Sequence, residues 1–205
     1  MENLDFNALG LYSVRWIHYV AGVCWIGLLY FLNLVNVPVQ GKLDAGVKKV
    51  LTPELMPRVL FWFRWGAMVT FLSGLTYYAL LFEMGGLRAS APNWSTWILL
   101  GMLLGTIMWF NVWFVIWPAQ RKIINGVKSG TPADASIPKK ALLFSRINTF
   151  LSVPMLFFMG FGRHAGGNVP FLSLDGIVVL LLAGGIGSAV VWFSIKQSGS
   201  ISTEV

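Results

Sequence analysis

The chain has 205 residues, of which 56% are hydrophobic and 11% are charged, and its mean hydropathy is +0.70. Soluble domains carry about a quarter charged residues, so this composition excludes a soluble globular protein and predicts an integral membrane protein. The formal net charge of +7 does not indicate nucleic-acid binding. The basic residues lie in short segments beside apolar runs, where such residues set membrane topology.

Five apolar runs are each close to the roughly 20 residues that a helix needs to cross a bilayer. They cover about residues 11–37, 58–82, 96–118, 142–162 and 173–195. We therefore expect an all-α bundle of about five transmembrane helices that forms a single domain over residues 1–205. No basic segment and no small-residue cleavage site precede the first run, so we expect it to remain as a membrane anchor.

The connections between the runs are polar. We expect loops from Lys42 to Arg58 and from Gln120 to Lys140, the second kept irregular by Gly130, Pro132 and Pro138. Twelve of the fifteen Lys and Arg residues lie in or beside these two connections and in the tail. The remaining three are Arg15, Arg88 and Arg163. This bias predicts an outer N-terminus and a cytoplasmic C-terminus in a bacterial-type inner (cytoplasmic) membrane.

One of the two histidines, His18, lies about two turns inside the first run. A histidine within a membrane helix must find a partner, so it is a candidate functional residue. It could be hydrogen-bonded to a neighbouring helix, ligate a haem or a metal ion, or relay protons. Gly22 at i+4 leaves room for a flat macrocycle, and Arg15 at i−3 could hold a propionate or extend to lipid headgroups.

The second histidine, His164, follows the fourth run within a glycine-rich segment and next to Arg163. The predicted topology puts it on the same side of the membrane as His18. Two helices that begin at one level would leave His18 roughly 10 Å deeper than His164, at 1.5 Å per residue. His164 could therefore be a second ligand of the same iron, a contact for a partner, or a solvated loop residue.

Polar residues elsewhere in the runs do not form a known catalytic motif. Asn33, Asn36, Asn111 and Asn148 are expected to form hydrogen bonds between helices. Nucleotide-binding fingerprints, hydrolase motifs and paired carboxylates are missing from the sequence, so it assigns no catalytic residue.

Several segments in chain order resemble the membrane domain of the urate hydroxylase (PuuD) family. The first is Arg15-Trp16-Ile17-His18 with Trp25-Ile26-Gly27, and the second is Trp62-Phe63-Arg64-Trp65 with Leu72-Ser73-Gly74. The third runs from Gly105 to Asn111 and on through Trp117-Pro118-Ala119-Gln120-Arg121-Lys122, and the fourth from Asn148 to Phe157. The resemblance covers about residues 12–165. It implies a membrane module that passes electrons to a fused cytochrome c domain.

Three positions depart from the pattern that this resemblance implies. Phe61 and Ile147 stand where histidines are expected, and Gly66 stands where a glutamate is expected. The 205 residues also contain no Cys-x-x-Cys-His, the attachment motif of haem c. The resemblance is therefore to a short form without the cytochrome c domain, and these departures argue against urate oxidation.

Three functions follow as hypotheses. The first is an electron-transfer subunit of an oxidoreductase complex in which His18, with or without His164, ligates a b-type haem, and Arg15 and Arg163 hold its propionates. Its partners would be a periplasmic cytochrome c or other membrane subunits, without nucleic acid. The second is a cofactor-free structural subunit of a larger membrane complex, and the third is a urate-oxidising membrane enzyme.

Overall fold

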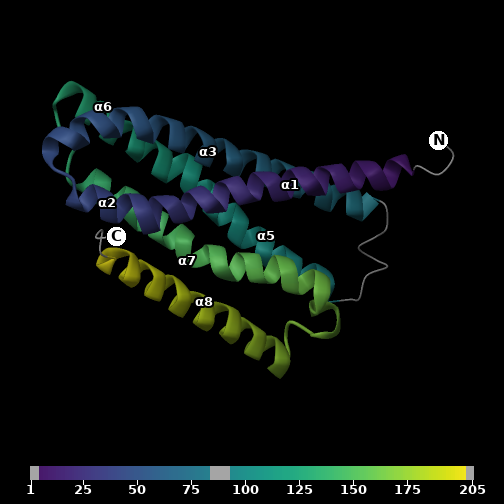
Figure 1. Ribbon diagram of the computed structural model, residues 1–205. Coiled ribbons are helices and arrows are strands. Elements are labelled where there is room, and N and C mark those ends of the chain that lie inside the picture. The colour runs from purple at the N-terminus through teal and green to yellow at the C-terminus, as the bar shows by residue number, and fades with distance from the viewer. Residues whose placement is uncertain (1–4, 84–92, 202–205) are drawn as a thin grey trace.

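The computed structural model describes residues 5–83 and 93–201, which are all-helical apart from short connections (Figure 1). The predicted five-helix membrane architecture is confirmed, because five helices are long and apolar enough to cross a bilayer. These helices are Phe6–Lys42, Ala45–Glu83, Thr96–Ser129, Ser136–His164 and Leu174–Ser200. The segment that contains Arg88 lies outside the described residues. The orientation of the termini stays a prediction.

The first and third membrane helices are each divided in the same way. The first consists of α1 (Phe6–Tyr30), a π-helical turn (Phe31–Asn36) and α2 (Val37–Lys42). The third consists of α5 (Trp94–Phe110), a π-helical turn (Asn111–Ile116) and α6 (Trp117–Ser129). A proline, Pro38 or Pro118, follows two residues after each π turn, at the start of the next helix, where its missing N–H is tolerated.

Both predicted loops proved to be largely helical. Only Leu43 and Asp44 separate α2 from α3 (Ala45–Glu83), and Pro53 and Pro57 lie inside that helix. The segment after Gln120 stays helical to Ser129 and ends at Gly130, whose φ of 71° is the left-handed conformation that glycine adopts without strain. The helices therefore continue past the apolar runs, and polar residues occupy their extensions.

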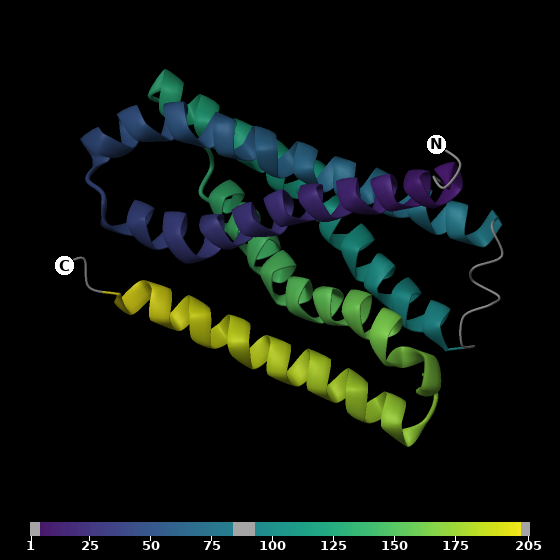
Figure 2. The same ribbon diagram turned by 45° about the vertical axis from the view of Figure 1, so that its right-hand side comes forward.

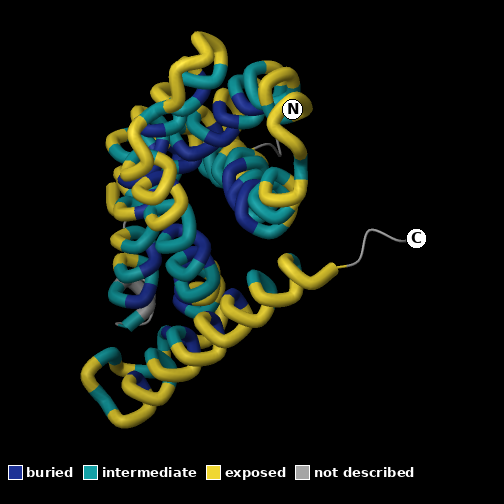
Figure 3. The backbone as a smooth tube through the Cα atoms, turned by 90° about the vertical axis from the view of Figure 1, so that its left-hand side faces the viewer, coloured by how far each residue is buried: buried dark blue, intermediate teal, exposed yellow. Residues whose placement is uncertain are grey.

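The helices pair into two antiparallel hairpins. The first hairpin packs α1 against α3, and the second packs α5 with α6 against α7 (Ser136–His164). Figure 2 shows the two hairpins crossing each other, with α8 (Leu174–Ser200) lying along α7. Figure 3 shows that α8 is mostly exposed along its length. In a membrane this exposed apolar surface of α8 faces lipid or another subunit.

Two ends of the bundle are distinguished below. The histidine end is the one where α1 begins and α3 and α7 finish, with His18 and His164. The basic end is the opposite one, where α2 and α6 finish and α3 begins. Most of the described lysines and arginines lie at the basic end. They are Lys42, Lys48, Lys49, Arg58, Arg121, Lys122, Lys128, Lys139 and Lys140.

Candidate functional site: a cavity beside His18

A cavity of about 570 Å³ lies beside His18 within the membrane-spanning part of the bundle. Its walls come from α1, α3, α5 and α7, and they are apolar apart from His18, two tyrosines and two threonines. This volume is within the range of small-molecule and cofactor sites in proteins. Met102, Met155 and Met159 of the second hairpin are among the residues that line this cavity.

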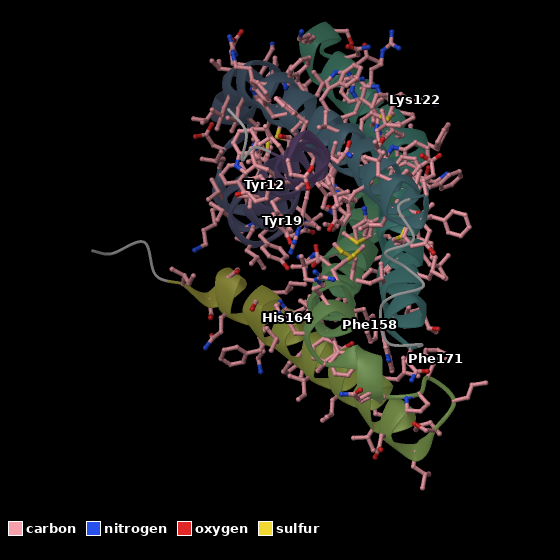
Figure 4. All side chains as sticks on the ribbon, turned by 90° about the vertical axis from the view of Figure 1, so that its right-hand side faces the viewer. Tyr12, Tyr19, Lys122, Phe158, His164 and Phe171 are labelled. Atoms are coloured by element: carbon pink, nitrogen blue, oxygen red, sulfur yellow. The ribbon has the colours of Figure 1, made fainter. Side chains whose placement is uncertain are left out.

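A second cavity of about 320 Å³ adjoins the first toward the histidine end. Arg15, His18, Arg163 and His164 all line it, so the structure brings together four of the five site residues that the sequence proposed. The fifth, Gly22, lines the larger cavity. Tyr19, which lines both cavities, and His164 are labelled in Figure 4, which views the molecule from the histidine end.

The two cavities are neighbours with a common wall, because they share six lining residues. These are His18, Tyr19, Gly74, Met102, Leu156 and Met159. The sequence predicted that His18 lies deeper in the membrane than His164, and the shared wall shows how both can border neighbouring cavities. His18 borders both cavities, whereas the exposed His164 borders only the smaller, outer one.

One hydrogen bond fixes the orientation of the His18 ring. Its Nδ1 lies 2.9 Å from the backbone oxygen of Thr70 on α3. A carbonyl oxygen only accepts, so Nδ1 carries the proton and donates it. In this tautomer of the neutral ring the lone pair is on Nε2, which can then ligate a metal ion. Among the described residues Nε2 has no hydrogen-bond partner.

A glycine on the neighbouring helix makes room for this ring. A Cβ atom at Gly74 would lie 2.9 Å from His18 Cε1 and 3.1 Å from Nδ1, closer than such atoms approach. Ser73, one residue earlier, has its hydroxyl oxygen 3.5 Å from the same Nδ1. Ser73 and Gly74 of the segment Leu72-Ser73-Gly74 thus pack against the His18 ring. The sequence alone did not indicate that this segment would contact His18.

Glycines also shape the cavity itself. A Cβ at Gly22 would meet only the Thr70 methyl carbon, at 3.8 Å, and one at Gly105 would meet nothing within 4 Å. Both glycines line the larger cavity, on α1 and α5 respectively. Side chains at these positions would project into the space, so the two glycines keep it open to a flat ligand.

Positive charge is concentrated at the smaller cavity, which is lined by Arg15 and Arg163. Arg15 Nε donates to the Tyr19 hydroxyl at 2.9 Å, and its guanidinium carbon lies 5.4 Å from the centre of the same ring. Arg163 lines the same cavity, whereas no carboxylate is among the described residues that line either cavity. The geometry therefore suits a ligand with an apolar body and an anionic edge.

The three positions that depart from the family pattern do not contribute to the two cavities. One of them, Gly66, is also too closely packed for a larger side chain. Phe61 is exposed, and Ile147 is partly buried. A Cβ at Gly66 would lie 3.3 Å from the backbone nitrogen of Trp25, so the first hairpin packs too closely there for a glutamate without movement. Phe61, Gly66 and Ile147 are not among the residues that line the two cavities.

The asparagines act in packing. Asn111 donates to the Asn148 side-chain oxygen at 2.8 Å, and Asn148 donates to the Met108 backbone oxygen at 2.9 Å. Asn33 donates to the Ser145 hydroxyl at 2.8 Å. The predicted hydrogen bonding between helices is therefore confirmed for these three asparagines.

Fold and site together define a multi-pass helical membrane protein with a partly buried histidine beside an apolar cavity. The family model described as urate oxidase N-terminal matches residues 87–203, which is more than half of the chain. The chain belongs to this family, as the sequence resemblance indicated. No curated protein and no solved structure matches it. His164 and Arg163 lie within the matched residues, whereas His18 and Arg15 precede them.

Proposed function

We propose that this member of the family is an electron-transfer subunit of the bacterial-type inner membrane that holds a b-type haem beside His18. The observation that carries the proposal is the hydrogen bond from His18 Nδ1 to Thr70. It directs protonation to Nδ1, so that Nε2 would be available to ligate the haem iron.

The residues of the two neighbouring cavities fit such a cofactor. Apolar walls and the glycines Gly22 and Gly105 accommodate a flat macrocycle, and Arg15 and Arg163 supply positive charge where its propionates would lie. A bound haem supplies one-electron chemistry. The protein would orient it, exclude water through the apolar walls, and tune its potential through the axial histidine and the two arginines.

His164 has a different place in this proposal. It is exposed and lines only the outer cavity, next to Arg163. It would either complete the ligation of the iron or contact a redox partner, a periplasmic cytochrome c or another membrane subunit. Its removal is therefore expected to loosen haem binding or slow partner reduction, without abolishing haem content.

The test is the haem content of purified His18→Ala, measured as the pyridine haemochrome per mole of protein. The matched control is Leu28→Ala, because Leu28 lies on the same helix as His18, is also partly buried and lines neither cavity. We expect stoichiometric haem in the wild type and in Leu28→Ala, and none in His18→Ala. Equal haem content in wild type and His18→Ala would refute the ligand assignment and leave the cofactor-free subunit as the better hypothesis.

A further inference from the structure

A separate groove of about 380 Å³ lies on α6, near the basic end of the bundle. Five residues of one face of that helix line it: Trp117, Pro118, Arg121, Lys122 and Asn125. Arg121 and Lys122 are exposed. The groove thus combines an apolar floor, formed by an indole and a proline ring, with two cations and an amide.

A third cation, Arg64 of α3, lies against Trp117, one of the residues that line the groove. The guanidinium carbon of Arg64 lies 4.1 Å from the centre of the Trp117 ring, 5.1 Å from that of Trp113 and 5.8 Å from that of Trp65. Its Nε is buried and has no hydrogen-bond partner among the described residues. The indole faces attract the positive charge but accept no strong hydrogen bonds, so the remaining N–H donors of Arg64 are available to an anion.

None of the described residues supplies a counter-ion for these three cations. Within residues 5–83 and 93–201 the only ion pair joins Arg58 to Glu54, and no carboxylate lines the groove. Arg64, Arg121 and Lys122 therefore generate an uncompensated positive potential around Trp117. An anion that binds there gains charge-assisted hydrogen bonds.

The position of the groove indicates which anion it would receive. Tryptophan is enriched where membrane proteins meet the lipid headgroups, and three tryptophans surround Arg64. At this level a helix meets phospholipid, whose phosphate is anionic and whose glycerol and acyl carbons are apolar. Basic sites on membrane helices bind anionic lipid headgroups through the same combination.

We propose that the groove on α6 is a binding site for an anionic phospholipid. The phosphate would be held by Arg64, Arg121 and Lys122, and the glycerol and first acyl carbons would pack on Trp117 and Pro118. This site is distinct from the cavity beside His18, and the proposal holds whether or not that cavity contains haem. A bound lipid there would join α3 to α6 and so link the two hairpins at their basic ends.

The test is native mass spectrometry of the delipidated full chain, titrated with cardiolipin, phosphatidylglycerol or phosphatidylethanolamine. We expect tighter binding of the two anionic lipids than of the zwitterionic one. The double variant Arg121→Ala/Lys122→Ala should bind them about 30-fold more weakly, because each interfacial cation contributes about fivefold.

The matched control is Lys139→Ala/Lys140→Ala, which removes two equally exposed cations from the same end of the molecule, on α7. It should bind anionic lipid as the wild type does. Equal weakening in both double variants, or equal affinity for all three lipids, would overturn the proposal. Displacement of cardiolipin by millimolar inorganic phosphate would also overturn it, in favour of a free-anion site. Unchanged thermal unfolding of lipid-free variants checks that they are folded.

Discussion

The two hairpins share a construction but differ in what they place at the histidine end. Counted from the π turns, His18 on α1 and Ile98 on α5 are equivalent, and each packs against a glycine of its antiparallel partner. A Cβ at Gly74 would lie 2.9 Å from the His18 ring, and one at Gly162 would lie 2.9 Å from Ile98 Cδ1. The same close approach holds an imidazole in one hairpin and an aliphatic side chain in the other.

The surroundings of the two positions differ as well. His18 has a backbone acceptor behind it and an open cavity in front. Beside Ile98, Trp97 is fully buried, donates from Nε1 to the Val169 backbone oxygen at 2.9 Å and contacts Phe158, Phe161 and Phe171. The cavity lies between the two hairpins, and the first hairpin supplies its histidine, whereas the part of the second hairpin around Trp97 is packed for stability.

The largest expected effect on haem binding, short of removing His18 itself, comes from filling the space behind the histidine. Gly74→Ala would force the His18 ring away from Thr70, whereas Gly162→Ala would press on Ile98 and the backbone that carries it. Overpacking costs about 1–3 kcal/mol, so haem affinity should fall about tenfold or more in Gly74→Ala. Titration of the two apoproteins with haem measures this. Equal affinities in the two variants would mean that the ring orientation is unimportant.

Trp97→Ala tests the structural role of the second hairpin. Truncation of a fully buried tryptophan costs about 3 kcal/mol or more in the free energy of unfolding, because a cavity is left. Reversible unfolding in a detergent titration should show this loss, while haem content stays as in the wild type. Loss of haem without loss of stability would contradict the division of roles between the hairpins.

Substitution of the asparagines in the two π turns is expected to have a smaller effect on the free energy of unfolding. Asn111→Leu would leave the Asn148 side-chain oxygen without its donor, and should cost about 1 kcal/mol of unfolding free energy. Asn33→Leu should cost less, because the Asn33 side-chain oxygen is already buried without a partner and its removal is favourable. The same unfolding assay compares them, and a larger loss in Asn33→Leu would be inconsistent with the hydrogen-bond arrangement.

The smallest effects are expected at the turns of the basic end, where an aspartate precedes the second helix of each hairpin. Asp44 accepts from the Val47 backbone N–H at 2.9 Å, so Asp44→Ala should cost about 1 kcal/mol. The Ser136 hydroxyl and N–H, which donate to Asp134, lower the pKa of that carboxyl. Its stabilisation is therefore present above the ordinary aspartate pKa and is lost as pH falls through the lowered value.

The pH dependence of unfolding checks this second aspartate. In the wild type, stability should decrease slightly on acidification below the ordinary aspartate range, and Asp134→Asn should remove that part of the decrease. Identical pH profiles for the two proteins would show that the hydrogen bonds from Ser136 do not contribute to stability.

The sequence predicted the five spans because each is a long apolar run, and it placed His18 and His164 on one side through the distribution of basic residues. It underestimated the helix lengths, since a polar stretch such as residues 120–129 is helical in the structure. Pro138 indicated a loop, yet it lies in the first turn of α7, and the loop expected from Lys42 to Arg58 is mostly helical even though α3 contains Pro53 and Pro57.

The support for His18 could not be predicted, because it depends on how α1 is aligned along α3. Thr70 contributes a backbone oxygen, and any residue at that position would offer one. Met102, Met155 and Met159 likewise resemble ordinary apolar residues of membrane helices until the crossing of the hairpins turns them toward the cavity. The relative register of packed helices is a property of the whole bundle, which a local pattern does not contain.

The most direct test of the central claim is a dithionite-reduced minus oxidised visible spectrum of the purified wild-type protein. If His18 ligates a haem, we expect a sharp b-type signal at about one haem per chain, which is absent from His18→Ala and retained in Leu28→Ala. A flat spectrum from folded wild-type protein supplied with haem would contradict the claim, and His18 would then be a packing residue of a cofactor-free subunit.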